Sequence, residues 1–118
     1  MKPAFFFGLC LLLAGLPSPF PSQLLPTRLE ITVRNELGNL EAGASVQLFK
    51  TQQDYDKGEN PVTEVKKTDA KGRTVFSDLE AIEYYVQAEK GDLDNQDAGV
   101  KTIKLVTKRT NKVTIIIS

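Results

Sequence analysis

The residues best suited to chemistry lie in one acidic loop at positions 92–97, which reads Asp-Leu-Asp-Asn-Gln-Asp. Carboxylate and amide oxygens are the ligands that Ca²⁺ prefers in proteins. Calcium is therefore the one cofactor that the sequence suggests, and the candidate ligands are Asp92, Asp94, Asn95 and Asp97. Their spacing does not fit the EF-hand loop, because Gln96 and Asp97 stand where that loop has a ligand followed by Gly. We therefore expect no cofactor and no metal, because a solvated loop whose Asp and Asn side chains bond to their own backbone accounts for these residues; calcium is the alternative.

The chain lacks the residue types that most catalytic mechanisms need. The sequence has no His, and its only Cys is Cys10, within an apolar N-terminal run. This composition excludes His-activated nucleophiles, the usual zinc sites and an intrachain disulfide. A carboxylate-dependent hydrolase would need two acids that converge in a cleft, whereas the acids here fall in turns and at outward strand positions. We therefore expect no catalytic residue and no enzyme activity, with such a hydrolase as the alternative.

Two exposed aromatic residues are the candidate partner contacts. Tyr55 lies in an irregular acidic stretch, residues 52–61, and Tyr85 lies at an outward position of an expected strand. An aromatic ring on a rigid element can stack on a sugar or anchor a protein. Cross-strand packing accounts for Tyr85 equally well. The sequence thus directs the search for a partner to these two residues and to the loops at residues 54–60 and 92–97.

The charges of the whole chain balance, since Lys and Arg number 15 and Asp and Glu number 15. Nucleic acids and anionic membranes select proteins with an excess of positive charge. We interpret the basic residues as solvated strand faces scattered among carboxylates; they include Lys66, Lys67, Lys101, Lys104, Lys108 and Arg109. We expect no nucleic-acid partner.

Residues 1–22 have the pattern of a secretory signal peptide. Lys2 precedes an apolar run at residues 5–16, too short to span a bilayer comfortably, and a Pro- and Ser-rich segment follows. An uncleaved anchor and a core helix are the alternatives, and the cleavage position is open between residues 15 and 27. Cys10 is a poor lipoprotein acceptor, because Leu9 precedes it where a small residue is needed. We expect a flexible leader at residues 23–27 and no membrane span after cleavage.

Residues 28–118 alternate between apolar and polar side chains, which is typical of half-buried strands. Expected strands cover residues 28–34, 45–49, 62–68, 73–76, 83–90, 100–107 and 112–118, with one helical turn allowed at residues 53–56. Phe49 should point away from the core and be covered by the next loop, with Tyr55 as its cover; a free-standing ligand platform is the alternative. The expected core residues are Leu29, Ile31, Val33, Val46, Leu48, Val65, Phe76, Leu79, Tyr84, Val86, Ala88, Ile103, Leu105, Val113, Ile115 and Ile117.

Seven short strands separated by turn residues predict an all-β fold, a seven-stranded antiparallel two-sheet sandwich with Greek-key connections. One stretch is more specific. The pattern T-D-x-x-G-x-x-x-F-x-x-L, followed by Y-x-V, is formed by Thr68, Asp69, Gly72, Phe76, Leu79, Tyr84 and Val86, and residues 43–48 add G-A-x-V-x-L.

This stretch resembles the carboxypeptidase regulatory-like domain family, whose members have a transthyretin (prealbumin)-like sandwich. The resemblance covers residues 28–118, and the nearest type is the small secreted Bacteroidota protein that carries this domain alone. Ile82 departs from the pattern, because the family usually has Gly there. The motif positions are core and turn positions, so the resemblance implies a fold more than a function.

The sequence therefore predicts a signal peptide at residues 1–22, a leader at 23–27 and one domain at 28–118. We expect a non-enzymatic exported module, periplasmic, cell-surface or secreted, that binds or scaffolds at the cell envelope with a protein or a glycan as partner. The alternative is a small ligand-binding or hydrolase-like protein that uses its acidic loops.

Overall fold

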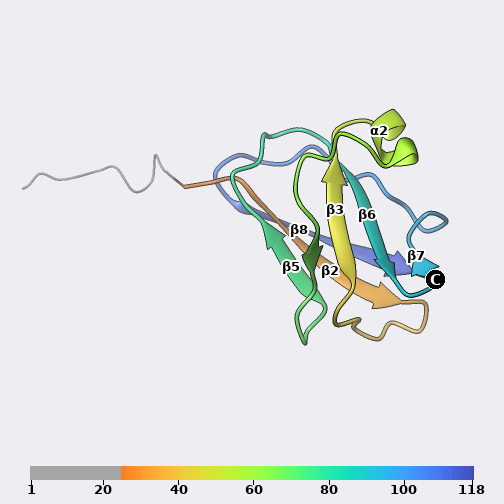
Figure 1. Ribbon diagram of the computed structural model, residues 1–118. Coiled ribbons are helices and arrows are strands. Elements are labelled where there is room, and N and C mark those ends of the chain that lie inside the picture. The colour runs from red at the N-terminus through yellow and green to blue at the C-terminus, as the bar shows by residue number, and fades with distance from the viewer. Residues whose placement is uncertain (1–24) are drawn as a thin grey trace, which may run out of the picture.

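The computed structural model describes residues 25–118, which form two packed β-sheets and one short helix (Figure 1). The predicted signal peptide and residues 23–24 of the predicted leader lie outside these residues. One sheet has three strands in the order β5-β2-β8, and the other has four in the order β4-β3-β6-β7. The strands are β2 (Arg28–Asn35), β3 (Ser45–Phe49), β4 (Lys66–Lys67), β5 (Arg73–Phe76), β6 (Tyr85–Lys90), β7 (Leu93–Asp94) and β8 (Thr110–Ile117). The helix α2 (Gln52–Lys57) follows β3.

The core lies between the two sheets and uses one face of each main strand. Successive side chains of a strand point to opposite faces, so β2, β3, β6 and β8 each bury every second residue at least in part. The buried cluster contains Leu29, Ile31, Val33, Ala44, Val46, Leu48, Phe76, Tyr84, Val86, Ala88, Leu105, Ile115 and Ile117. The all-β, two-sheet prediction is confirmed, whereas the Greek-key connection order stays a prediction.

The expectation of a wholly antiparallel sandwich is wrong in one place. The first and last strands, β2 and β8, run parallel over eight residue pairs, from Arg28 opposite Thr110 to Asn35 opposite Ile117. The other strand pairs are antiparallel. Apolar alternation reports which face of a strand is buried but not which way its neighbour runs, so the pattern contained no signal for this pairing.

The predicted strand at residues 100–107 does not form, and Ile103, expected in the core, is 77% exposed. The segment touches β6 only around Lys101, which lies opposite Tyr85 in an isolated bridge. The hydroxyl of Thr102 accepts from the Tyr84 N–H at 3.0 Å and donates to the Ile103 carbonyl at 2.7 Å, and these bonds end the pairing there. Leu105 alone returns to the core. Instead, the short strand β7, which lies in the loop predicted between the strands at residues 83–90 and 100–107, pairs with the end of β6 at Glu89 and Lys90.

The predicted strand at residues 62–68 is also shorter than expected. Only β4 pairs with β3, and Val65, expected to face inward, is 51% exposed. After Pro61 the Val62 N–H donates to the Leu48 carbonyl at 2.8 Å, and the Thr63 hydroxyl accepts from the Leu48 N–H at 3.3 Å. These contacts hold the chain at the end of β3 before β4 begins, so Val65 lies outside both sheets.

The leader expected at residues 23–27 ends earlier than predicted. Thr27 is buried, its hydroxyl accepts from the Lys108 N–H at 3.0 Å, and its carbonyl accepts from the Leu79 N–H at 3.0 Å. Both bonds tie it to segments far away in the sequence. Thr27 therefore belongs to the folded domain, one residue before the boundary that the sequence pattern predicts.

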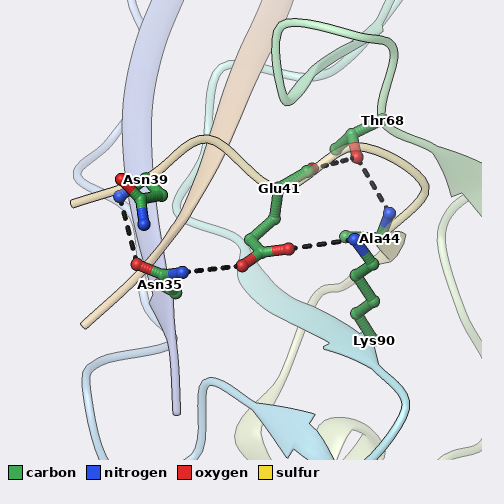
Figure 2. A network of polar contacts seen from close by, with 6 residues as sticks. All are labelled: Asn35, Asn39, Glu41, Ala44, Thr68 and Lys90. Carbon is green, nitrogen blue, oxygen red and sulfur yellow. Dashed lines mark hydrogen bonds and ion pairs between the residues drawn. The ribbon is translucent and has the colours of Figure 1, made fainter. Parts of the chain in front are cut away.

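A polar network centred on Glu41 joins the two sheets at the end that β6 reaches with Lys90 (Figure 2). The Glu41 carboxylate accepts from the Lys90 ammonium at 3.0 Å and from the Asn35 amide at 2.9 Å. The Glu41 backbone carbonyl accepts from the Thr68 hydroxyl at 2.6 Å. The same hydroxyl accepts from the Ala44 N–H at 2.9 Å. The network thus links the end of β2 in one sheet to the end of β6 in the other.

Glu41 makes the stability of this link depend on pH. The Lys90 ammonium and the Asn35 amide hold the pKa of the Glu41 carboxyl below its usual value. A lowered folded pKa means that the ionised group stabilises the fold above its unfolded pKa, about 4.3, and that this contribution is lost as the pH falls further. We expect Glu41→Gln to lower the urea midpoint at neutral pH and to approach the unaltered chain as the pH drops. A difference in urea midpoint that stays constant down to acid pH would contradict this expectation. The Asp69 carboxyl also has a lowered pKa, but it is present in both proteins, so its contribution cancels in the comparison.

Candidate functional site

Helix α2 is built to hold Tyr55 against the outer face of the four-stranded sheet. Thr51 caps its start, with the side-chain oxygen accepting from the Asp54 N–H at 3.0 Å. Gly58 ends it in the left-handed conformation. The Tyr55 ring packs edge-on against Phe49, with ring centroids 6.0 Å apart at 86°. Phe49 is buried but lies outside the core cluster, so the prediction that Tyr55 covers it from the far side of the sheet is confirmed.

A cavity of about 410 Å³ opens beside this helix. Its walls come from α2, from the outer face of β6 and from the loop after β7; they are formed by Gln52, Tyr55, Asp56, Lys57, Gly58, Gln87, Gln96 and Val100. Small-molecule sites occupy about 300–1,000 Å³ and are lined mostly by apolar side chains. This cavity has that size, but most of its lining residues are polar. The cavity therefore joins the two loops that the sequence singled out, residues 54–60 and 92–97, into one candidate site.

The surroundings of the cavity are acidic. The two loops carry Asp54, Asp56, Glu59, Asp92, Asp94 and Asp97, against the single lysine Lys57. Burial, together with the carboxylates of Asp94 and Asp56, raises the pKa of the Tyr55 hydroxyl. Tyr55 therefore remains a neutral phenol at physiological pH, able both to donate and to accept a hydrogen bond. The negative field disfavours an anionic ligand.

The second candidate contact, Tyr85, lies apart from the cavity walls. It is half-buried on β6, opposite Phe49 in the ladder with β3. The Lys101 ammonium stands 5.9 Å from its ring centroid and also pairs with Glu83 at 3.1 Å. Cross-strand packing and this lysine engage the ring, and Tyr85 does not line the cavity.

The four candidate calcium ligands do not converge. Asn95 is fully buried and points into the sheet: its Oδ1 accepts from the Ala88 N–H at 3.0 Å, and its Nδ2 donates to the Val86 carbonyl at 2.8 Å. The Asp94 carboxylate accepts from the Gln96 N–H at 3.0 Å, whereas Asp92 and Asp97 are exposed. Within residues 25–118, no three or more acidic, Cys or His side chains gather closely enough to hold a metal ion. Nor does any helix there have the length and apolarity to cross a membrane.

Sequence reasoning missed the polar lining of the cavity. Gln87 is at an outward position of β6, as the alternation predicts, but Gln52 and Gln96 come from segments that the pattern leaves irregular. An amide on an exposed strand face is a weak signal, since such residues are common on solvated surfaces. The packing of α2 against β6 is what places the three amides together.

No protein-family model matches this chain, and neither does any curated protein. Among solved structures it is similar to a streptococcal ancillary pilin, with a TM-score of 0.59 and 14% identity over 80% of this chain and 32% of the pilin. It is also similar to BcpA, the major pilin subunit of Bacillus cereus, with a TM-score of 0.52 and 18% identity over 79% of this chain and 30% of the pilin. A variant of BcpA gives a TM-score of 0.56 and 19% identity over 78% of this chain and 28% of that chain.

These identities are low enough that the likeness concerns the fold alone. The chain spans less than a third of the length of each pilin. The class that the fold and the comparisons define is therefore an all-β sandwich similar to part of a pilin subunit. The resemblance to carboxypeptidase regulatory-like domains stays a prediction from the sequence.

Proposed function

We propose that this chain is a non-enzymatic, exported β-sandwich module that binds a neutral glycan at the cell envelope. The observation that carries the proposal is the cavity of about 410 Å³ beside α2, where an aromatic ring and several amides meet. The expected signal peptide supports export. The likeness in fold to pilin subunits supports a place at the cell envelope.

The chemistry of the cavity suits a hydroxyl-rich ligand. Each sugar hydroxyl both donates and accepts, and the amides of Gln52, Gln87 and Gln96 offer both functions. The Tyr55 ring adds an apolar surface for the C–H face of a sugar. The acidic loops around the cavity favour an uncharged saccharide over an acidic one.

The same geometry supports the absence of catalysis. Hydrolysis of a glycosidic bond by carboxylates needs two acids on either side of the bond. Asp56 is the only carboxylate among the described residues that line the cavity. The nearby Asp94 accepts a bond from the Gln96 N–H within its own loop, and the chain has no His to replace it.

The test is a printed array of neutral and acidic glycans, followed by calorimetry with the best-bound glycan. We expect a neutral glycan to bind, and we expect Gln52→Ala and Gln87→Ala each to weaken it about tenfold by removing hydrogen bonds. Gln53→Ala is the matched control, because Gln53 is exposed on the same helix but does not line the cavity. Equal loss of binding in Gln53→Ala, or binding of acidic glycans alone, would contradict the proposal.

A hydrolase that uses the acidic loops predicts a different result. Incubation of the bound glycan with the protein would then release shorter products, and Asp94→Asn would abolish the release. We expect no product from either protein, because only one acid faces the cavity. Product formation that Asp94→Asn removes would replace the binding proposal with an enzymatic one.

A further inference from the structure

One edge of the three-stranded sheet is open from Thr110 to Ile117. Just beyond it, the Ser118 N–H donates to the Asp94 carbonyl at 2.9 Å and the Asp94 N–H donates to the Ser118 carbonyl at 3.2 Å, which closes the edge at its C-terminal end. Strand β8 is the last in the order β5-β2-β8, and no described strand pairs with its other side. The opposite edge is covered: on β5, the Lys66 ammonium donates to the Val75 carbonyl at 2.6 Å and the Asp69 N–H donates to the Arg73 carbonyl at 2.9 Å. An unpaired strand edge is a template for another strand.

The register with β2 shows which backbone groups of β8 are free. Arg28 lies opposite Thr110 and donates its N–H to the carbonyl of Arg109 at 3.0 Å. In a parallel ladder, alternate residues of a strand bond to one neighbour and the residues between them face the other side. The N–H and C=O groups of Lys112, Thr114 and Ile116 therefore point away from β2, toward the open edge.

The residues around this edge are basic. Residues 99–118 contain Lys101, Lys104, Lys108, Arg109 and Lys112, and no Asp or Glu. Among the described residues only one of these cations forms an ion pair, Lys101 with Glu83, and Glu30 neighbours Lys112 across the β2–β8 ladder. Residues 99–118 therefore carry no carboxylate of their own, whereas in space Glu83 lies beside Lys101 and Glu30 beside Lys112.

An apolar cavity of about 250 Å³ lies next to the same edge. The residues of β8 that line it are Asn111, Lys112 and Val113, and across from them lie Leu29 and residues 101–103 and 105. It exists because residues 103–107 leave β6 instead of continuing the predicted strand. Ile103 stands 77% exposed at its rim and Val106 is 48% exposed nearby.

From these observations we infer that the open edge of β8 binds an extended, acidic segment of a partner protein by strand addition. The free groups of Lys112, Thr114 and Ile116 form the backbone ladder. Alternating acidic side chains of the partner face the basic residues, and an aliphatic side chain enters the apolar cavity. Alternation of acidic and aliphatic residues is what a strand with one charged and one buried face requires.

The charge pattern argues against a second copy of this chain as the occupant. Pairing two β8 edges would bring Lys112, Arg109 and Lys108 of both copies to one interface, and like charges on paired strands repel. The apolar run at residues 5–16 of the same chain has no acidic residue to meet these cations. A partner of opposite charge is the occupant that the edge selects.

The binding test uses the full chain and an acetylated peptide of alternating Glu and Val, about eight residues long to match β8. We expect the peptide to bind, and added salt to weaken it by screening the charges. The same peptide with Lys in place of Glu should bind at least about tenfold more weakly. A Glu-Val peptide N-methylated at alternate residues keeps its charge but loses ladder bonds, so it should also bind about tenfold more weakly.

Two kinds of variant place the binding on the edge. Thr114→Pro removes an N–H that faces outward and is not used by β2, so we expect weaker peptide binding relative to Thr114→Val, which keeps the N–H. If Thr114→Pro fails to fold, the charge reversal Lys108→Glu with Lys112→Glu serves instead. That variant should lose the Glu peptide and gain the Lys peptide. Neither residue lines the glycan cavity, so glycan binding tests the proposed function separately.

Amide hydrogen exchange gives the decisive pattern. We expect the Lys112, Thr114 and Ile116 amides to exchange rapidly in the free chain and to become protected by the Glu-Val peptide, while the Val113 and Ile115 amides are protected in both states. Equal binding of the N-methylated peptide, or unchanged exchange at Lys112 and Thr114, would overturn the inference. Protection of these amides in the free chain would also overturn it, because the chain itself or a second copy would then occupy the edge.

Discussion

Replacing Tyr84 by Ala is expected to lower the free energy of unfolding by about 3–5 kcal/mol, as truncation of a large core aromatic does. Tyr84 is the largest fully buried side chain among the described residues and is 1% exposed. It lies immediately before β6, and Thr102 holds its backbone through two bonds, of 3.0 Å to its N–H and 2.8 Å to its carbonyl. A domain of this size is stable by about 5–15 kcal/mol, so this one change removes a large share.

Tyr84→Phe separates the ring from its hydroxyl. The Tyr84 hydroxyl accepts from the Glu80 N–H at 3.0 Å and donates to the Glu80 carbonyl at 3.1 Å, which fixes the turn between β5 and β6. We expect Tyr84→Phe to cost about 1–2 kcal/mol, the range for losing a hydrogen-bonded hydroxyl. Urea unfolding followed by circular dichroism measures both variants. Equal losses for Ala and Phe would show that the ring adds nothing to the core, contrary to its burial.

Replacing Asn95 by Ala is expected to cost about 2–4 kcal/mol, because buried backbone groups lose their partners. Strand β6 is paired on one side by β3 over its whole length except Lys90, but its other side has β7 only at Glu89 and Lys90. Residues 100–102 resume the contact at Val86 and Tyr84. In the gap between them, the Asn95 amide bonds to the Ala88 N–H and the Val86 carbonyl and so replaces the missing strand.

Two comparisons make this second prediction specific. Asp92→Ala, in the same loop but exposed, should change stability by less than about 0.5 kcal/mol. Asn95→Asp keeps the acceptor but places a carboxylate oxygen where Nδ2 faces the Val86 and Gly99 carbonyls, so it should destabilise at least as much as Ala. In Asn95→Ala the Ala88 amide should exchange faster with solvent. A loop that tolerates Asn95→Ala as well as Asp92→Ala would contradict this role.

Asn95 is also a residue whose role in the structure differs from the role that the sequence pattern predicts. In the sequence it is one of four oxygen-bearing residues in an acidic loop, and its neighbours predict either calcium binding or turn formation. The fold instead turns this side chain inward, to the edge of β6. Nothing in the local pattern distinguishes it from Asp94 or Asp97, because its partners are backbone groups seven and nine residues away.

The sequence by itself determined the elements that depend on local rules. Alternating side chains specified the buried faces of β2, β3, β6 and β8, and they correctly set Phe49 on the outer face under Tyr55. Asp69 and Gly72 specified the turn before β5. The Asp69 carboxylate accepts from the Lys71 and Arg73 N–H groups, and Gly72 has a φ of 72°. A Cβ at Gly72 would stand 2.8 Å from the Val33 carbonyl, so only Gly fits there.

Only the tertiary structure decided the features on which both functional proposals rest. The cavity exists because α2 and the loop after β7 meet across β6, and the open edge exists because β8 pairs in parallel with β2 at the far end of the chain. Val65 and Ile103 fit the apolar alternation but stand exposed, because the chain leaves the sheets around them. Alternation within a strand reports which face is buried. The neighbour of a strand, its direction and its free edge follow from contacts between distant residues, which no local pattern encodes.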